Sequence, residues 1–166
     1  KSSRIISKLT YYNMATRKII GIVFSVIAIL FSITFLIQSD LNINIKEYFD
    51  HSFKSYFSLS YFNQILPLIL CFILLYGGVL LIIKPIKSNP VLALFGFTVL
   101  EEIMFSWFGL ISIDFPIYIV VIFFTSALLA LWIAYSDTIN QKHLSLKEGV
   151  SSLIMGTLIN ALSYYL

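Results

Sequence analysis

The chain has 166 residues, of which 59% are hydrophobic and 11% charged, and its formal net charge is +3 at pH 7. Its mean hydropathy of +0.94 lies above the usual range of soluble domains. This length and composition leave no room for a separate soluble catalytic domain. We therefore expect residues 1–166 to form a single transmembrane domain whose surroundings are a lipid bilayer.

Five stretches are apolar and long enough to cross about 30 Å of hydrocarbon, which takes roughly 17 to 25 helical residues. They cover residues 19–37, 65–83, 91–113, 115–135 and 144–166. Because backbone polar groups in lipid must be paired within their own segment, these stretches are predicted to be α-helices. The predicted fold class is an all-α, polytopic membrane helical bundle of four to five transmembrane helices. The alternative for 144–166 is a helix that lies in the membrane interface.

The basic residues are distributed unequally over the segments between the predicted spans. Of the 11 Lys and Arg residues, five lie in 1–18, two follow the second span and two follow the fourth. The loop 38–63 holds the remaining pair, Lys46 and Lys54. Short loops rich in Lys and Arg stay cytoplasmic, so 1–18 is predicted to be a cytoplasmic basic segment, with an external C-terminus if 144–166 spans. Topology thus explains the net charge without a nucleic-acid partner.

The loop 38–63 is the one sizeable segment outside the predicted spans and should lie on the external side. Apolar side chains recur along it at helical spacing: Ile45, Phe49, Phe53, Tyr56 and Phe57. This pattern predicts an amphipathic helix in the outer headgroup region. The two histidines, His51 and His143, fall on opposite sides of the membrane, and the chain has no phosphate-binding or Cys-x-x-Cys motif. We expect no metal site, no cofactor and no catalytic residue set.

Every predicted span carries small residues on one face, at steps of three and four residues. They include Gly21, Ser25, Ala28 and Ser32; Pro67, Cys71 and Gly78; Ser126, Ala130 and Ala134; and Gly149, Ser152, Gly156, Asn160 and Ser163. Helices in lipid associate through such faces, because small residues let the backbones approach closely. We expect these faces to form the helix contacts of the bundle.

Glu101 and Glu102 are adjacent carboxylates inside the third predicted span, which contains no basic residue. An ionisable side chain near the bilayer centre costs about 2.5 to 3.5 kcal/mol on insertion scales, so its presence indicates a function. If Asn89 caps the helix and Pro90 lies in its first turn, Glu102 is roughly 18 Å into the helix, close to the midplane. Since no span offers a cation at this depth, we expect both carboxyls to be protonated at pH 7.

The two carboxyls point in directions about 100° apart around the helix. On the side of Glu102 the residues at three- and four-residue steps are small or polar: Thr98, Ser106, Gly109 and Ser112. On the side of Glu101 they are aromatic or Met: Phe97, Met104, Phe105 and Phe108. We therefore expect Glu102 in the bundle interior, and Glu101 at its border or in contact with another subunit.

Polar residues of two other spans reach a similar depth. Asn160 lies about 17 Å into the last span, and Thr125 and Ser126 arrive near this depth from the opposite direction. We predict that Glu102 meets Asn160 and either Thr125 or Ser126 at the midplane. The candidate functional polar cluster comprises Glu101, Glu102, Ser106, Thr125, Ser126 and Asn160.

The sequence Glu101-Glu102-Ile103-Met104-Phe105 resembles the Glu-Glu-x-x-x-Arg signature of the CAAX-processing and bacteriocin-processing intramembrane proteases. The resemblance covers five residues and implies a glutamate-activated water. Ser106 stands where that family has Arg, and Trp132 and Gly156 stand where loose spacing would place its two histidines. A glutamate without an imidazole partner is a poor general base, so this resemblance supports, as a further alternative, only a degenerate relative without activity.

The sequence therefore predicts a small multi-pass membrane protein that acts by association. Its expected partners are the lipid bilayer and other membrane protein subunits, and its expected role is that of an accessory or assembly subunit of a larger complex. In this interpretation a midplane carboxyl serves as an interhelical or intersubunit hydrogen-bonding group. The alternative is a proton- or cation-coupled channel or carrier that uses Glu102, as membrane-embedded acids often do.

Overall fold

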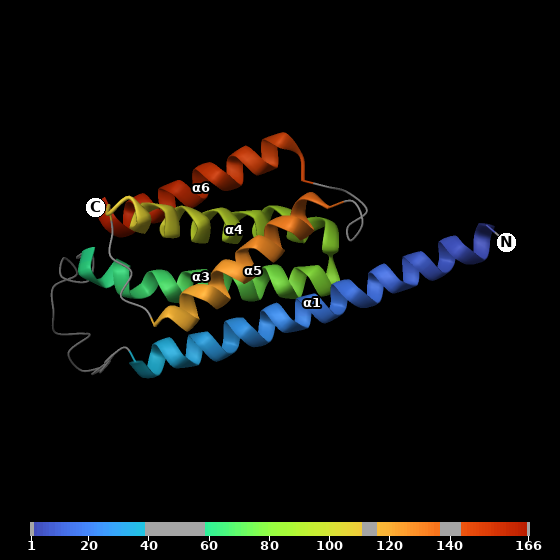
Figure 1. The fold of residues 1–166 in the computed structure, drawn as a ribbon, viewed down its shortest axis with the longest axis horizontal. Helices are drawn as coiled ribbons and strands as arrows, with labels where there is room; N and C mark the ends of the chain where they lie inside the picture. Colours follow the sequence, from blue (N-terminus) through green and yellow to red (C-terminus); the bar gives the residue numbers. More distant parts are fainter. Residues whose placement is uncertain (1, 39–58, 111–115, 137–143, 166) are drawn as a thin grey trace, which may run out of the picture.

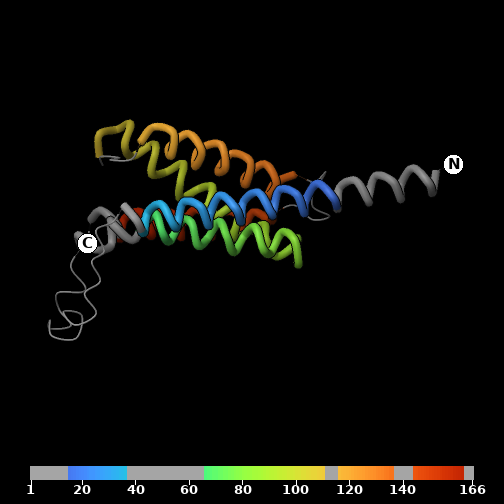
Figure 2. The backbone as a smooth tube through the Cα atoms, turned by 90° about the horizontal axis from the view of Figure 1, so that it is seen from below, coloured from blue at the N-terminus to red at the C-terminus, as the bar shows by residue number. Residues whose placement is uncertain are grey.

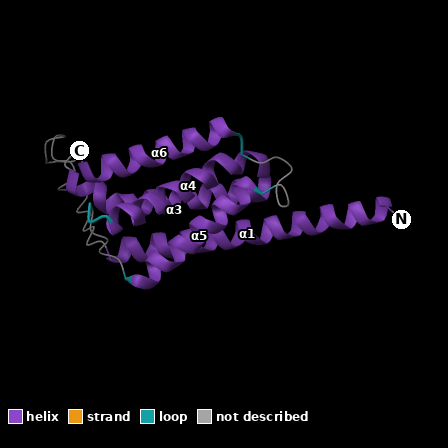
Figure 3. Cartoon of the chain, turned by 45° about the horizontal axis from the view of Figure 1, so that its top comes forward, coloured by secondary structure: helices purple, strands orange, loops and turns teal. Residues whose placement is uncertain are grey.

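The computed structural model describes residues 2–38, 59–110, 116–136 and 144–165. In these ranges the chain is almost entirely helical, without a β-strand (Figures 1 and 3). The helices are α1 (Ser2–Gln38), α3 (Leu59–Ile83), α4 (Pro85–Trp107), α5 (Ile117–Tyr135) and α6 (Leu146–Tyr165). The prediction of an all-α bundle is confirmed.

Four of these helices contain segments that are long and apolar enough to cross a membrane. The segments are Ala15–Leu36, Leu66–Ile83, Pro85–Trp107 and Ile117–Tyr135. Each overlaps one of the first four predicted spans, and together they define a multi-pass integral membrane protein. The helix α6 has 20 residues, long enough for about 30 Å, but it is not among these four. A fifth crossing by α6 stays a prediction.

The helix α4 is the centre of the bundle. It packs against α3, α5 and α6, whereas α1 packs mainly on α3 (Figure 1). Seen from below, α5 lies to one side of the layer formed by α1 and α3, and α4 slants from that layer towards α5 (Figure 2). Residues on α4 therefore face different neighbours depending on their position around the helix.

The predicted small-residue faces form the helix contacts. Their members in the described residues are buried or half-buried, from Gly21 in α1 to Asn160 in α6. The closest crossing joins α1 to α3: a Cβ atom built on Gly78 would lie 2.8 Å from the carbonyl oxygen of Gly21, and one built on Gly21 would lie 2.7 Å from that of Gly78. Only glycine at both positions permits this distance between the two backbones.

The boundaries of α4 differ from the prediction. The helix begins at Pro85 after the N-cap Lys84 and ends at Trp107, instead of covering 91–113. Asn89 is buried inside the helix and does not cap it. The reason is that two prolines compete for the first turn, and Pro85 takes the favoured N1 position. One non-helical residue, Lys84, therefore connects α3 to α4.

The end of α4 is formed by a glycine turn. Gly109 has a φ of +68°, and its N–H bonds the carbonyl of Ser106 at 3.0 Å, while that of Leu110 bonds the carbonyl of Phe105 at 2.9 Å. A left-handed glycine just after the last helical turn satisfies carbonyls that the helix leaves unpaired. Gly109 is thus exposed in a turn. The prediction that it continues the polar stripe of Glu102 along the helix is wrong.

The predicted segments outside the spans fall only partly in the described ranges. The predicted basic segment 1–18 is helical from Ser2 as the start of α1. The predicted interfacial helix of 38–63 falls largely in 39–58, and Ser112 in 111–115; both lie outside the described residues.

Candidate functional site

A row of polar contacts joins α4 to α6 along their parallel course, and we call it the α4–α6 polar seam. It begins where the Ser152 hydroxyl donates to the carbonyl of Pro90 at 3.0 Å. One turn further, Gly156 lies against Thr98, so closely that an added Cβ would be 3.0 Å from the Thr98 hydroxyl oxygen. The close approach at this glycine brings the next polar side chains of α6 within reach of α4.

The seam ends at the carboxyl of Glu101. Its Oε1 accepts a hydrogen bond from the Thr157 hydroxyl at 2.9 Å, and its Oε2 accepts one from Asn160 Nδ2 at 3.3 Å. The same Nδ2 donates to the carbonyl oxygen of Thr98 at 3.0 Å. One carboxyl of α4 is therefore fixed by two donors of α6, which is an interhelical use of an intramembrane acid.

Asn160 is the buried centre of the seam, with no exposed surface. Its amide nitrogen faces two acceptors, so the opposite orientation of the amide would place oxygen against oxygen. This orientation leaves Oδ1 without a hydrogen-bond partner among the described residues. A buried unpaired acceptor costs about 1–3 kcal/mol, so the two bonds made by Nδ2 also have to offset this cost.

The prediction that Asn160 meets Glu102 is wrong in its choice of carboxyl. Asn160 bonds Glu101, the neighbour of the predicted partner. Thr98 explains the error: it lies three residues before Glu101 and four before Glu102, so both acids share a helix face with it. A polar stripe through Thr98 could not distinguish between the two.

Glu102 is in the bundle interior, as predicted, with 7% of its surface exposed. It lines an apolar cavity between α1, α3, α4 and α5, together with Phe35, Pro67, Leu70, Val99, Ile103, Ile119, Val120 and Phe123. The space open to water-sized molecules is about 30 Å³, room for one or two waters. No other side chain among these lining residues is polar.

The depth of Glu102 in α4 differs from the predicted midplane. Between Glu102 and Trp107, the last residue of α4, there is about 8 Å of helix. The earlier start of α4 thus shifts both carboxyls towards the end that carries Trp107. The exposed Trp107 and Phe108 at this end are typical of a membrane interface.

The remaining residues of the predicted cluster are not brought to Asn160. Thr125 is exposed on α5 and its hydroxyl bonds its own helix, at 2.9 Å from the carbonyl of Val121. Ser126 is buried, and Ser106 is half-buried near the end of α4. Neither of these serines hydrogen-bonds Asn160: Ser126 is on α5, which has little contact with α6, and Ser106 lies beyond Glu101 towards the end of α4.

Two members of the seam were missed in the sequence. Ser152 was assigned only to a small-residue face, and Thr157 to no site at all. A signal for Thr157 exists, since it is three residues before Asn160 and so lies on the same side of α6.

The capping box at the start of α6 was also missed in the sequence. It is formed by Ser145-Leu146-Lys147-Glu148, and the backbone nitrogen of Ser145 lies 2.9 Å from Glu148 Oε2.

The carboxyls of Glu101 and Glu102 belong to separate environments: Glu101 to the seam with α6, Glu102 to the cavity bounded by α1, α3 and α5. They do not form a dyad around one reacting atom. Comparison with protein-family models, with curated proteins and with solved structures found no match. The site itself, in a multi-pass helical membrane protein, is therefore the basis for a functional proposal.

Proposed function

We propose that this protein acts by association, as an accessory or assembly subunit of a larger membrane protein complex. The observation that carries the proposal is the position of Glu101. Its carboxyl is hydrogen-bonded between α4 and α6, yet it is only half-buried, and Thr157 beside it is exposed. This polar pair therefore opens onto an outer face of the bundle.

That outer face is otherwise apolar. Along the same side of α4 lie Phe97, Met104 and Phe108, of which Met104 is 51% and Phe108 72% exposed. Lipid would solvate the aromatic and Met side chains but not the carboxyl, and intramembrane acids usually face protein or a water-filled cavity. A partner protein that covers this face supplies the missing polar environment.

Photo-cross-linking in native membranes tests this proposal. A photoreactive phenylalanine at Met104 is expected to yield a discrete protein adduct above the 19.0 kDa chain. The matched control carries the photoreactive phenylalanine at Val26 on α1. Val26 is 48% exposed and Met104 51%, and the residue introduced at Val26 should react with lipid alone. Equal adduct patterns at both positions, or none at either, would count against a specific partner.

In the alternative, a proton- or cation-coupled channel or carrier, Glu102 is the group that binds the proton or cation. Its favourable feature is a buried carboxyl beside a water-sized cavity. Among the described residues that line this cavity, Glu102 is the one polar side chain. We expect Glu102→Gln, which keeps hydrogen bonding but removes titration, to leave assembly and cellular function unchanged. Loss of function with intact assembly would favour the channel or carrier.

The proposed orientation places the N-terminus in the cytoplasm and, with α6 as a fifth crossing, the C-terminus outside. In intact cells, a cysteine at Tyr118, at the start of α5, should react with a membrane-impermeant maleimide. A cysteine at Lys147, at the start of α6, should not react. Both positions are exposed, and Cys71 is fully buried. The reverse labelling pattern would contradict this topology.

A further inference from the structure

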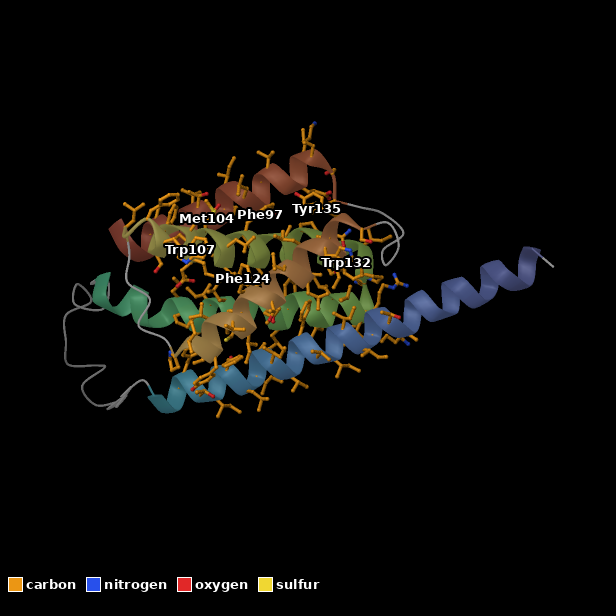
Figure 4. All side chains as sticks on the ribbon, in the orientation of Figure 1. Phe97, Met104, Trp107, Phe124, Trp132 and Tyr135 are labelled. Carbon is orange, nitrogen blue, oxygen red and sulfur yellow. The ribbon has the colours of Figure 1, made fainter. Side chains whose placement is uncertain are left out.

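One side of α4 is left uncovered by α5 and α6. Both of these helices pack on α4 but have little contact with each other. Figure 4 shows Phe97, Met104 and Trp107 of α4 and Phe124 of α5 on this side. We call this surface the α4 face and define it by Phe97, Glu101, Met104, Phe108 and Phe124. Of these side chains, Met104, Phe108 and Phe124 are exposed.

The α4 face contains one group that an apolar helix or lipid cannot satisfy. Glu101 follows Phe97 by four residues and precedes Met104 by three, so its carboxyl lies on the uncovered side as well as towards α6. Thr157 and Asn160 donate hydrogen bonds to it but bring no positive charge. In the described parts of α4, α5 and α6 the basic residues are Lys87 and Lys147, each in the first turn of its helix. Lys87 is fourteen residues before Glu101, about 21 Å along α4, and so cannot reach the carboxyl.

We infer that the α4 face docks a transmembrane helix of another membrane protein that carries a Lys or Arg at the depth of Glu101. The ammonium or guanidinium would approach from the uncovered side, while α6 holds the carboxyl in place from the other. An opposite charge stabilises the ionised carboxyl, and pairing is the usual state of charged groups in membranes. This inference rests on the proposed function and names the chemistry of the partner.

The described residues of a second copy do not supply this cation. The basic residues at the edge of the first span, Arg17 and Lys18, line a cavity with Leu81 and Pro85. That cavity is at the start of α4, at the end of the bundle opposite to Glu101. Two copies with the same orientation in the membrane therefore hold these groups at different depths, and we assign the cation to a different chain.

Energy transfer in phosphatidylcholine vesicles tests the inference with defined probes. The labelled protein is mixed with a leucine-rich single-span peptide that carries one Lys at the depth of Glu101. Matched peptides carry Gln or Leu at the same position. We expect the Lys peptide to associate about tenfold more strongly than the Leu peptide, a difference of ~1.4 kcal/mol.

The adjacent carboxyls give matched protein variants. Glu101→Gln should reduce association of the Lys peptide to the level of the Leu peptide, Glu101→Asp should keep most of it, and Glu102→Gln should leave it unchanged. Helix content and unfolding temperature are measured for each variant, and the recovery with Asp separates loss of charge from loss of fold.

Three results would overturn the inference: equal association of the Lys and Leu peptides, equal association of the Lys and Gln peptides, or dependence on Glu102 instead of Glu101. Each leaves the proposed function standing if cross-linking at Met104 still yields a discrete protein adduct. Absence of that adduct, by contrast, would remove the proposed function itself.

Discussion

Gly78→Ala is expected to destabilise the bundle by about 1–3 kcal/mol, although alanine is the better helix former. The new Cβ would lie 2.8 Å from the carbonyl oxygen of Gly21 and 2.9 Å from the Ser25 hydroxyl oxygen. Because the first of these atoms is backbone, the contact can be relieved only by moving α1 away from α3. The close packing along the first two spans would then be lost.

The neighbouring glycine provides the control. A Cβ on Gly77 would be 2.9 Å from a terminal methyl of Leu92, a side chain that can adjust. Gly77→Ala should therefore change stability by less than about 1 kcal/mol, since the gain in helix propensity offsets the crowding. Thermal unfolding in mild detergent, followed by circular dichroism, measures both variants. Equal melting temperatures would show that the Gly21–Gly78 crossing does not limit stability.

Asn160→Asp should be the most damaging change in the α4–α6 polar seam, with an expected cost of about 3 kcal/mol. Asp has nearly the shape of Asn but replaces the donor nitrogen with oxygen. That oxygen would face the Thr98 carbonyl and the Glu101 carboxyl, now at 3.0 and 3.3 Å from the nitrogen. An ionised Asp replaces both hydrogen bonds with contacts between acceptors, and a protonated Asp, with its single O–H, keeps one of the two at most.

Thr157→Val is the matched change at the edge of the seam. It keeps the side-chain shape and removes only the hydroxyl that bonds Glu101 at 2.9 Å, so its cost should be below ~1 kcal/mol, as for most interhelical hydrogen bonds in membranes. Thermal unfolding of both variants tests whether Asn160→Asp costs more stability than Thr157→Val. If the Asn160→Asp variant were as stable as the wild type, Asn160 would not be what joins α4 to α6.

The spans and the contact faces of the helices could be predicted because both follow from local periodicity. The stripe of Ser152, Gly156 and Asn160, for example, repeats every four residues, and its buried side packs against α4. The bundle needs close backbone contacts, and only small residues allow them. Such a face can be identified without knowing the neighbouring helix.

The choice between Glu101 and Glu102 could not be predicted, because it depends on how α6 is placed around α4. Thr98 is compatible with either acid on its face, and the tertiary structure places Glu101 towards α6. The prediction of where α4 starts was wrong for a related reason. Pro85 and Pro90 are both suited to a first helical turn, and the one-residue connection through Lys84 is decided by the packing of α3 on α4.

The proposed function requires that this chain works in association with another membrane protein. Its most direct test is the mass of the protein after extraction from its native membrane in mild detergent, corrected for bound detergent and lipid. We expect a discrete assembly heavier than the 19.0 kDa chain that contains a second, different polypeptide. A stable and functional species of 19.0 kDa alone would contradict the proposal.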